Sequence, residues 1–228
     1  EHGAIRIGFL KDDTGISTIE MPDGRFSGAM TDYIQYAASC LGNQKLDFKL
    51  TEYNSYEEET EALKSDEIDM IFHFSQNPDT AEEYHFAFTN TAWTYNLMAV
   101  TNKTSFNENE SNRIAVPKDD LPLKEHIEYY YPQWDVVECD SVDDAANLVI
   151  KKQADGFVTG VASALDYSEK YNLYSLPLFN AKKSAFAVKS GDHYLLSILN
   201  KTIKAMPSNM LTSAIAMYES TPGKVTLA

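Results

Sequence analysis

Residues 4–10 read AIRIGFL, and the apolar side chains of Ile5, Ile7 and Phe9 alternate with polar or small ones. Alternation with a period of two predicts a β-strand. A related stretch returns at residues 113–116, which read RIAV where residues 6–9 read RIGF. The chain therefore contains two similar segments about half its length apart, and each opens on a strand.

Helices and strands alternate after the first of these strands. Apolar spacing predicts a helix over 30–41, and a period of two predicts a strand over 46–50. Ser55 and Glu58 have the spacing of a capping box, which predicts a helix ending near Lys64. A buried strand is expected over 68–74. Three strands joined by two crossover helices predict a βαβαβ unit with a parallel sheet.

The second segment repeats this order. We expect a helix over 122–130, a strand over 135–139, a helix capped by Ser141 and a strand over 156–159. Further elements complete the chain: a strand over 185–188, a helix over 192–206 and a last helix over about 208–219. The pattern predicts an α/β protein with two lobes.

The two lobes have no Gly/Ser-rich linker between them, because the passages near 99–104 and 181–187 read as strands. The chain would therefore pass from one lobe to the other twice, through these two strand-like passages. This predicts a discontinuous first lobe, residues 1–99 plus 187–228, and a second lobe, residues 100–186. The two crossings also predict a cleft between the lobes. In open α/β sheets, ligands bind beyond the carboxyl ends of the strands.

Composition excludes several classes of partner and site. The 228 residues carry 34 acidic and 19 basic side chains, a net charge of −15. Such a chain repels nucleic acid and anionic membranes. Cys40 and Cys139 lie far apart and predict neither a metal site nor a disulfide framework. No catalytic motif is present and the five histidines are scattered, so we expect no enzyme, no catalytic residue and no cofactor.

Several short sequence segments occur in the same order as in the type 2 periplasmic solute-binding proteins (bacterial extracellular solute-binding protein family 3, amino-acid-binding type), which the chain resembles. The matching segments are Ile5–Gly8, Asp23-Gly24 with Gly28 and Asp32-Tyr33, Asn77-Pro78-Asp79, Phe88-Thr89, Tyr131-Pro132, Ala154–Thr159 and Ser184–Lys189. The resemblance implies a two-lobed Venus-flytrap fold with a mixed sheet in each lobe. It also implies lobes that close on a small solute outside the cytoplasm.

The clamp that this family uses for an α-amino acid does not match the sequence. Thr80 stands at the position of the Arg that binds the ligand carboxylate, and Asp119-Asp120 replaces the small Gly-Thr step. Gly160 stands where the ammonium-binding Asp is expected. A ligand carboxylate would meet like charges with no cation opposite. We therefore expect a cationic, neutral or aromatic solute, or a lobe pair that has lost solute binding.

The residues near the predicted strand ends are the candidate ligand contacts. They are Asp12, Tyr53, Phe74, Ser75, Asn77, Trp93, Tyr95, Asp119, Asp120 and Gly160. Aromatic rings there would bind apolar, sugar or cationic ligands.

Each group of candidates also has a structural interpretation. Trp93 and Tyr95 could pack in the core or hinge, and Asp119-Asp120 could cap the following helix. Ser75 and Asn77 could cap the next turn. His73 could point into the cleft or be a hydrogen-bonded, half-buried histidine. The run 57–59 of three glutamates reads as a solvated helix face.

Three functions remain open at this point. The first is the sensor ectodomain of a membrane-tethered bacterial receptor, a histidine kinase or a diguanylate cyclase, with a homodimer formed through the receptor. It is favoured by the altered clamp and by Leu196–Lys201 followed by Met206-Pro207, which resemble the receptor-borne branch. The second is the substrate-binding protein of an ABC importer. The third is a lobe pair that binds no solute.

Overall fold

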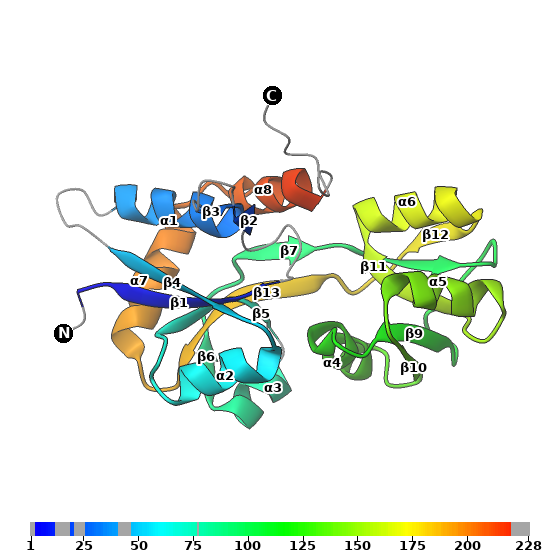
Figure 1. Ribbon diagram of the computed structural model, residues 1–228, viewed down its shortest axis with the longest axis horizontal. Helices are drawn as coiled ribbons and strands as arrows, with labels where there is room; N and C mark the ends of the chain where they lie inside the picture. The colour runs from blue at the N-terminus through cyan, green and yellow to red at the C-terminus, as the bar shows by residue number, and fades with distance from the viewer. Residues whose placement is uncertain (1–2, 12–18, 21–25, 41–46, 77, 220–228) are drawn as a thin grey trace. The chain divides into compact units, whose positions relative to one another are not determined.

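The computed structural model describes residues 3–11, 19–20, 26–40, 47–76 and 78–219 (Figure 1). The chain forms two compact units. Unit 1 is Glu1–Thr94 with Lys183–Ala228, and unit 2 is Tyr95–Lys182. The boundaries expected from the sequence, after residues 99 and 186, lie a few residues further along the chain. Each unit is described by itself.

Unit 1 contains a mixed sheet whose strand order, among the described residues, is β4-β1-β5-β13-β6, with β7 also paired to β13. The strands are β1 (Ile5–Leu10), β4 (Phe48–Tyr53), β5 (Met70–Ser75), β6 (Phe86–Phe88), β7 (Trp93–Tyr95) and β13 (Lys182–Lys189). Strand β1 runs parallel to β4 and β5, as the βαβαβ pattern predicts, and β13 is antiparallel to β5. A separate short ladder joins β2 (Ile19–Glu20) and β3 (Phe26–Ser27).

Helices cover this sheet and bury its aromatic side chains. They are α1 (Ala29–Cys40), α2 (Tyr56–Lys64), α3 (Pro78–Tyr84), α7 (His193–Ala205) and α8 (Met210–Glu219). Tyr33 of α1 packs on Phe186 of β13, with ring centroids 4.6 Å apart. Its hydroxyl lies 2.6 Å from the hydroxyl of Thr202, which ties α1 to α7.

The beginning of α2 confirms one prediction and corrects another. Ser55 is the N-cap, and its side chain accepts a hydrogen bond from the Glu58 backbone N–H at 3.2 Å. Glu57 and Glu58 are exposed, but Glu59 is only 1% exposed, so the prediction of a solvated face is wrong for Glu59. The cause is helical spacing: Glu59 lies four residues before the buried Leu63, on the side of α2 that packs inward.

Unit 2 contains a five-stranded mixed sheet with the order β10-β9-β11-β8-β12. The strands are β8 (Leu97–Thr101), β9 (Arg113–Pro117), β10 (Asp135–Cys139), β11 (Gly156–Gly160) and β12 (Tyr174–Pro177). Strand β9 runs parallel to β10 and β11, which confirms the predicted second βαβαβ segment. Strands β8 and β12 add antiparallel pairs.

Helices cover both faces of the unit 2 sheet (Figure 1). The side chains of the sheet alternate between the two faces. Ile114 and Val116 pack with α4 (Leu121–Tyr130), whereas Ala115 packs with α5 (Val142–Ile150) and α6 (Val161–Tyr171). Alternation along a strand places neighbouring residues on opposite faces. Unit 2 is therefore a three-layer α/β/α arrangement.

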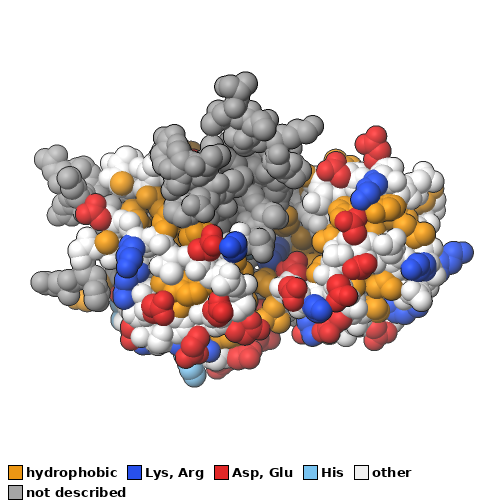
Figure 2. Space-filling model, viewed as in Figure 1, with side chains coloured by type: hydrophobic (Ala, Val, Ile, Leu, Met, Phe, Trp, Pro, Cys, Tyr) orange, Lys and Arg blue, Asp and Glu red, His pale blue; other side chains and the backbone are white. Residues whose placement is uncertain are grey.

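Charged side chains lie over the surfaces of both units. Figure 2 shows acidic groups interspersed with Lys and Arg on the face drawn. Within the described ranges, no helix is both long enough and apolar enough to cross a membrane.

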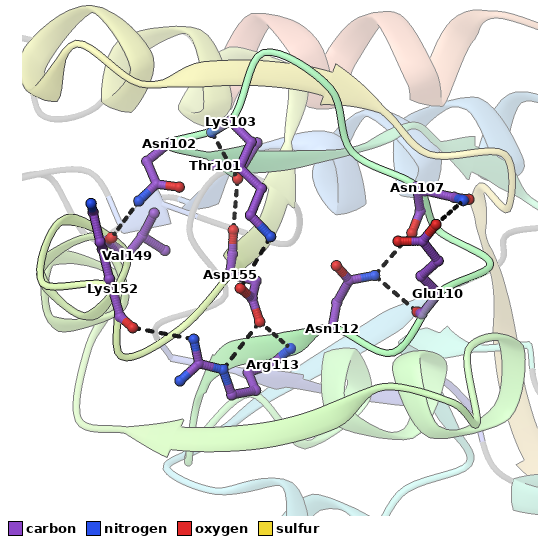
Figure 3. Close-up of polar contacts among 10 residues, drawn as sticks. All are labelled: Thr101, Asn102, Lys103, Asn107, Glu110, Asn112, Arg113, Val149, Lys152 and Asp155. Atoms are coloured by element: carbon purple, nitrogen blue, oxygen red, sulfur yellow. Dashed lines mark hydrogen bonds and ion pairs between the residues drawn. The ribbon is translucent and has the colours of Figure 1, made fainter.

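A polar network fastens β11 to β9 and β8 in unit 2 (Figure 3). The Asp155 carboxylate accepts hydrogen bonds from the backbone N–H and the Nε of Arg113, at 3.0 and 3.1 Å, and Lys103 Nζ lies 3.2 Å away. The Thr101 hydroxyl donates to the Asp155 carbonyl oxygen at 2.6 Å. Asp155 directly precedes β11, so these contacts set where that strand begins.

Candidate functional site

The carboxyl ends of β1, β4 and β5 meet at one edge of the unit 1 sheet, because the three strands are parallel. Tyr53 ends β4, opposite Leu10 of β1, and Ser75 ends β5. Edges of this kind bind ligands in α/β proteins. Asp12 and Asn77, which the sequence also places here, lie outside the described residues.

Tyr53 is buried, and its hydroxyl donates a hydrogen bond to Glu67 Oε1 at 3.1 Å. Burial, together with the negative charge of Glu67, raises the pKa of Tyr53 to about 12. The phenol therefore stays protonated near neutral pH, and its proton is directed at Glu67. The role of Tyr53 as a ligand contact stays a prediction.

Phe74 is 1% exposed and lies among other aromatic rings of unit 1. Its ring centroid is 5.2 Å from that of Tyr56, 5.3 Å from Phe88 and 5.7 Å from Phe86. This packing places Phe74 in the core of unit 1 and does not support the predicted ligand contact.

Ser75 is also buried, opposite Ser184 of β13. The residue after it, Gln76, has its side-chain oxygen bound by the Thr91 hydroxyl at 2.6 Å and donates to the Thr89 carbonyl at 3.3 Å. The chain leaving β5 is therefore held by neighbouring residues of unit 1.

Trp93 is 3% exposed and stacks on two side chains of β5. The ring centroid of Trp93 lies 5.5 Å from that of Phe72 and 5.3 Å from that of His73, with interplanar angles of 30° and 23°. His73 is half-buried, and its Nε2 lies 3.1 Å from the Ser184 hydroxyl. The interpretation of His73 as a hydrogen-bonded, half-buried histidine is confirmed. Trp93 Nε1 is enclosed and makes no hydrogen bond with the described residues.

Tyr95 and Gly160 are brought together in unit 2. Gly160 ends β11 and is the N-cap of α6, with no side chain to cap the helix. A Cβ atom added at Gly160 would lie 2.7 Å from Cζ of Tyr95 and closer still to its hydroxyl. The phenol of Tyr95 therefore occupies the space that any larger side chain at position 160 would need.

Asp120 caps α4, because its Oδ1 accepts a hydrogen bond from the Leu123 backbone N–H at 3.1 Å. The interpretation of this residue as a helix cap is confirmed. Asp119 is exposed beside it. The two carboxylates stand at the N-terminus of α4, beyond the carboxyl end of β9.

The surface of the described residues has a shallow depression in each unit, and neither of these contains a predicted ligand contact. The depression in unit 1, about 370 Å³, lies along α7 and is lined by Asn90, His193, Leu196, Ser197, Asn200, Lys201 and Lys204. The depression in unit 2, about 260 Å³, is lined by Glu138, Cys139, Asp140, Asp144, Asn147, Leu148 and Lys151. No group of three or more metal-ligating side chains occurs within the described part of the chain.

Sequence reasoning missed a pair of buried basic side chains in unit 2, His126 and Lys182. His126 is 2% exposed and Lys182 is 9% exposed. His126 appeared in the sequence only as one of five scattered histidines, and Lys182 only as part of a strand-like passage. Burial of an ionisable side chain is a tertiary property, so no local pattern could have marked them.

Comparison with known proteins decides the family. The sequence profile described as "Bacterial extracellular solute-binding proteins, family 3" matches residues 5–217. The chain belongs to this family. The family is defined by solute binding rather than catalysis, and it places the chain outside the cytoplasm.

Among curated proteins, this family member is similar to the virulence sensor protein BvgS of Bordetella pertussis (strain Tohama I). The two are 26% identical over 218 residues, which is 90% of this chain but 17% of the length of BvgS. The same protein from Bordetella bronchiseptica matches to the same extent.

Solved structures share the fold. The crystal structure of the B. pertussis BvgS periplasmic VFT2 domain has a TM-score of 0.72 and 24% identity, over 95% of this chain and 94% of that one. The ancestral amino-acid-binding protein AncCDT-1, a precursor of cyclohexadienyl dehydratase, has a TM-score of 0.65 and 16% identity, over 95% of each chain. The predicted two-lobed Venus-flytrap fold is thereby confirmed.

Proposed function

We propose that this chain is the solute-binding sensor domain of a bacterial membrane receptor of the histidine kinase or diguanylate cyclase type. The observation that carries the proposal is the match to a sensor protein over 90% of this chain and only 17% of that protein. A match of this kind is typical of one domain within a larger receptor. The receptor would tether the domain to the membrane and pair it with a second copy.

The ligand of this domain is a cationic, neutral or aromatic solute rather than an α-amino acid held by the standard clamp. Two features support this part of the proposal. The Tyr95 phenol fills the space at Gly160 where an ammonium-binding carboxylate would stand. Asp119 adds an exposed negative charge beside the cap residue Asp120, which favours a cation over a carboxylate.

Signalling in this proposal is a population shift. A solute that contacts both units favours a closed arrangement only by the difference between its affinities for the closed and open states. That difference is the free energy available to bias the attached output domain.

A thermal-unfolding screen tests solute binding. The panel contains polyamines, neutral sugars, aromatic compounds and free α-amino acids. A true ligand at one hundred times its dissociation constant raises the free energy of unfolding by roughly 2.7 kcal/mol. Stabilisation by one of the first three classes supports the proposal. Stabilisation by α-amino acids alone, or by no class, contradicts it.

The second candidate is the binding protein of an ABC importer. It is favoured by the fold of a substrate-binding protein of an amino acid ABC transporter, with a TM-score of 0.64 and 18% identity. The gene distinguishes the two. A reading frame that continues past Ala228 into an apolar run of about 20 residues, the length of a membrane-spanning helix, supports the sensor. A stop codon there supports the importer protein.

A further inference from the structure

The outward face of α7 in unit 1 is basic. It lines the depression of about 370 Å³, whose side chains include His193, Lys201 and Lys204 but no carboxylate. Lys201 and Lys204 are exposed, and neither forms an ion pair with any residue that the structure describes. The chain as a whole has a net charge of −15, so a face of this charge is an exception on its surface. The charge of the α7 face favours an acidic partner.

The other polar groups of the α7 face also suit an acidic partner. The side-chain oxygen of Asn200 accepts a hydrogen bond from the Asn90 backbone N–H at 2.7 Å, which leaves the Asn200 amide nitrogen as a donor. The hydroxyl of Ser197 is exposed one turn away. Small molecules bind in concave pockets that enclose most of their surface, whereas this depression is shallow. The α7 face is therefore better suited to a protein surface than to a small anion.

The outward face of α2 carries the opposite charge. Glu57, Glu58 and Glu61 are exposed on it, and Glu57 and Glu61 form no ion pair within the described ranges. The one basic residue of this helix, Lys64, places its Nζ over the Tyr84 ring, 4.8 Å from the ring centroid.

The spacing of the charges is similar on the two helices. Glu57 and Glu61 are four residues apart, and Lys201 and Lys204 are three residues apart. These separations are about 6 and 4.5 Å along a helix axis, close to one turn in each case.

The α2 and α7 helices meet at one corner of unit 1 (Figure 1). The Lys189 ammonium donates a hydrogen bond to the Lys64 carbonyl at the end of α2, at 3.0 Å. The Lys189 carbonyl accepts a hydrogen bond from the backbone N–H of Asp192, the N-cap of α7, at 3.2 Å. Helix α2 therefore ends where α7 begins. A twofold axis at this corner would lay α7 of each copy along α2 of the other, and the same contact would form twice.

We propose that the basic face of α7 binds the acidic face of α2 in a second copy of this domain. The inference rests on the pairing of two copies in the proposed function, and it names the surfaces that form the pair. The net charge of −15 opposes pairing, but physiological salt screens repulsion between exposed charges more than about 8 Å apart. Directly opposed lysine and glutamate side chains lie within that distance. The tether to a receptor further favours the contact, because it raises the effective concentration of the second copy.

Sedimentation equilibrium of the whole chain measures this pairing. The wild type should form a dimer whose dissociation constant rises with salt concentration. One variant combines Lys201→Glu with Lys204→Glu, and a second combines Glu57→Lys with Glu61→Lys. Each should weaken the dimer about tenfold or more, because like charges then face each other. An equimolar mixture of the two variants should recover the dimer, since both contacts of a mixed pair again join opposite charges.

The matched control combines Lys49→Glu with Lys151→Glu, at two exposed lysines outside both faces. This variant should dimerise as the wild type does. Thermal unfolding establishes that each variant is folded. Should a double variant not fold, the single substitutions Lys201→Glu and Glu61→Lys replace it.

Three results would overturn the contact: a wild type that stays monomeric at low salt, a reversed variant that dimerises like the wild type, or a mixture that stays monomeric. A monomeric wild type that binds a glutamate-rich peptide would instead assign the α7 face to a different acidic partner. The solute screen is repeated on the two reversed variants. A solute that still binds to them would preserve the solute-binding part of the proposed function, whatever the sedimentation result.

Discussion

The Arg6 guanidinium and the Asp69 carboxylate form a two-point ion pair, with Nη2–Oδ1 and Nε–Oδ2 distances of 2.6 and 3.0 Å. The backbone N–H of Arg6 also donates to Asp69 Oδ2 at 2.8 Å, and Nη1 donates to the Asp66 carbonyl at 2.7 Å. These contacts join the beginning of β1 to the residue that precedes β5.

Unit 2 repeats this arrangement (Figure 3). Arg113 binds Asp155 through its backbone N–H and Nε, and its Nη2 donates to the Lys152 carbonyl at 3.1 Å. Asp66 and Lys152 each lie three residues before their aspartate, and both have a left-handed backbone, with φ of 62° and 59°. The repeated sequence therefore has a structural cause: each copy encodes the same turn and the same Arg–Asp contact.

The Asp155 network makes stability depend on pH. Burial alone would raise the pKa of Asp155, but hydrogen bonds from Arg113 and Lys103 outweigh it and lower the pKa to about 2. A carboxylate with a folded pKa below its unfolded value of about 3.9 stabilises the fold above that pH, and the contribution is lost as pH falls towards 2. We expect Asp155→Asn to cost about 1–2 kcal/mol at pH 7, after allowance for solvent screening, and almost nothing near pH 2.

Urea unfolding at a series of pH values measures this difference. The exposed Asp166 of α6 provides the control, and Asp166→Asn should follow the wild type throughout. A penalty for Asp155→Asn that stays constant from neutral to acidic pH would show that the ion pairs of Asp155 do not cause it.

Gly160→Ala should destabilise unit 2 by about 1–3 kcal/mol, the usual cost of overpacking, because the new methyl group meets the Tyr95 ring. In a Tyr95→Ala background the same substitution should cost almost nothing, since the ring is gone. A double-mutant cycle, measured by urea unfolding, gives the coupling free energy between positions 95 and 160. Gly3→Ala, where a Cβ would meet nothing within 4 Å, is the control. Additive costs at positions 95 and 160 would contradict the predicted contact.

Asp120→Ala should lower the free energy of unfolding by about 1 kcal/mol, because it removes the cap of α4. Asp119→Ala should leave stability unchanged but weaken binding of any cationic solute found in the screen. Unfolding curves and calorimetry on both variants separate the two roles. Equal stability of the two variants would be incompatible with a cap at Asp120 alone.

Trp93→Ala and Tyr95→Ala should each weaken binding of any solute found in the screen. Trp93→Ala should also cost about 3–5 kcal/mol of stability, because it empties a stacked position in the core. Affinity is therefore measured by calorimetry at a temperature where each variant is folded. Tyr194→Ala, at an 89% exposed residue of α7, is the control. Unchanged affinity in both test variants would place the ligand elsewhere.

The strands and helix caps that depend on a regular residue spacing could be predicted from sequence, because residues close together in the chain determine them. The strands near Arg6 and Arg113 and the caps at Ser55 and Ser141 all depend on spacing within a few residues, and all are present. The short strand β7 and the helix α6 were not predicted. Strand β7 has only three residues, too few for a period to show, and α6 opens on a glycine without a capping side chain.

The candidate site was less predictable because it depends on which side chains meet. The sequence placed Phe74 at a strand end but could not show the aromatic rings that enclose it. The sequence indicated Tyr95 and Gly160 as separate candidates. It could not show that the Tyr95 ring fills the space beside Gly160. Lys182 went unnoticed because burial of a lysine leaves no local pattern.

The contact between Tyr95 and Gly160 also constrains how this domain can change over evolutionary time. A carboxylate side chain at position 160 would clash with the Tyr95 ring, so a cost in stability would come before any new ligand could bind. The order of substitutions that avoids this cost is a smaller residue at position 95 first and a larger residue at position 160 second. While Tyr95 is present, any side chain larger than glycine at position 160 meets its ring.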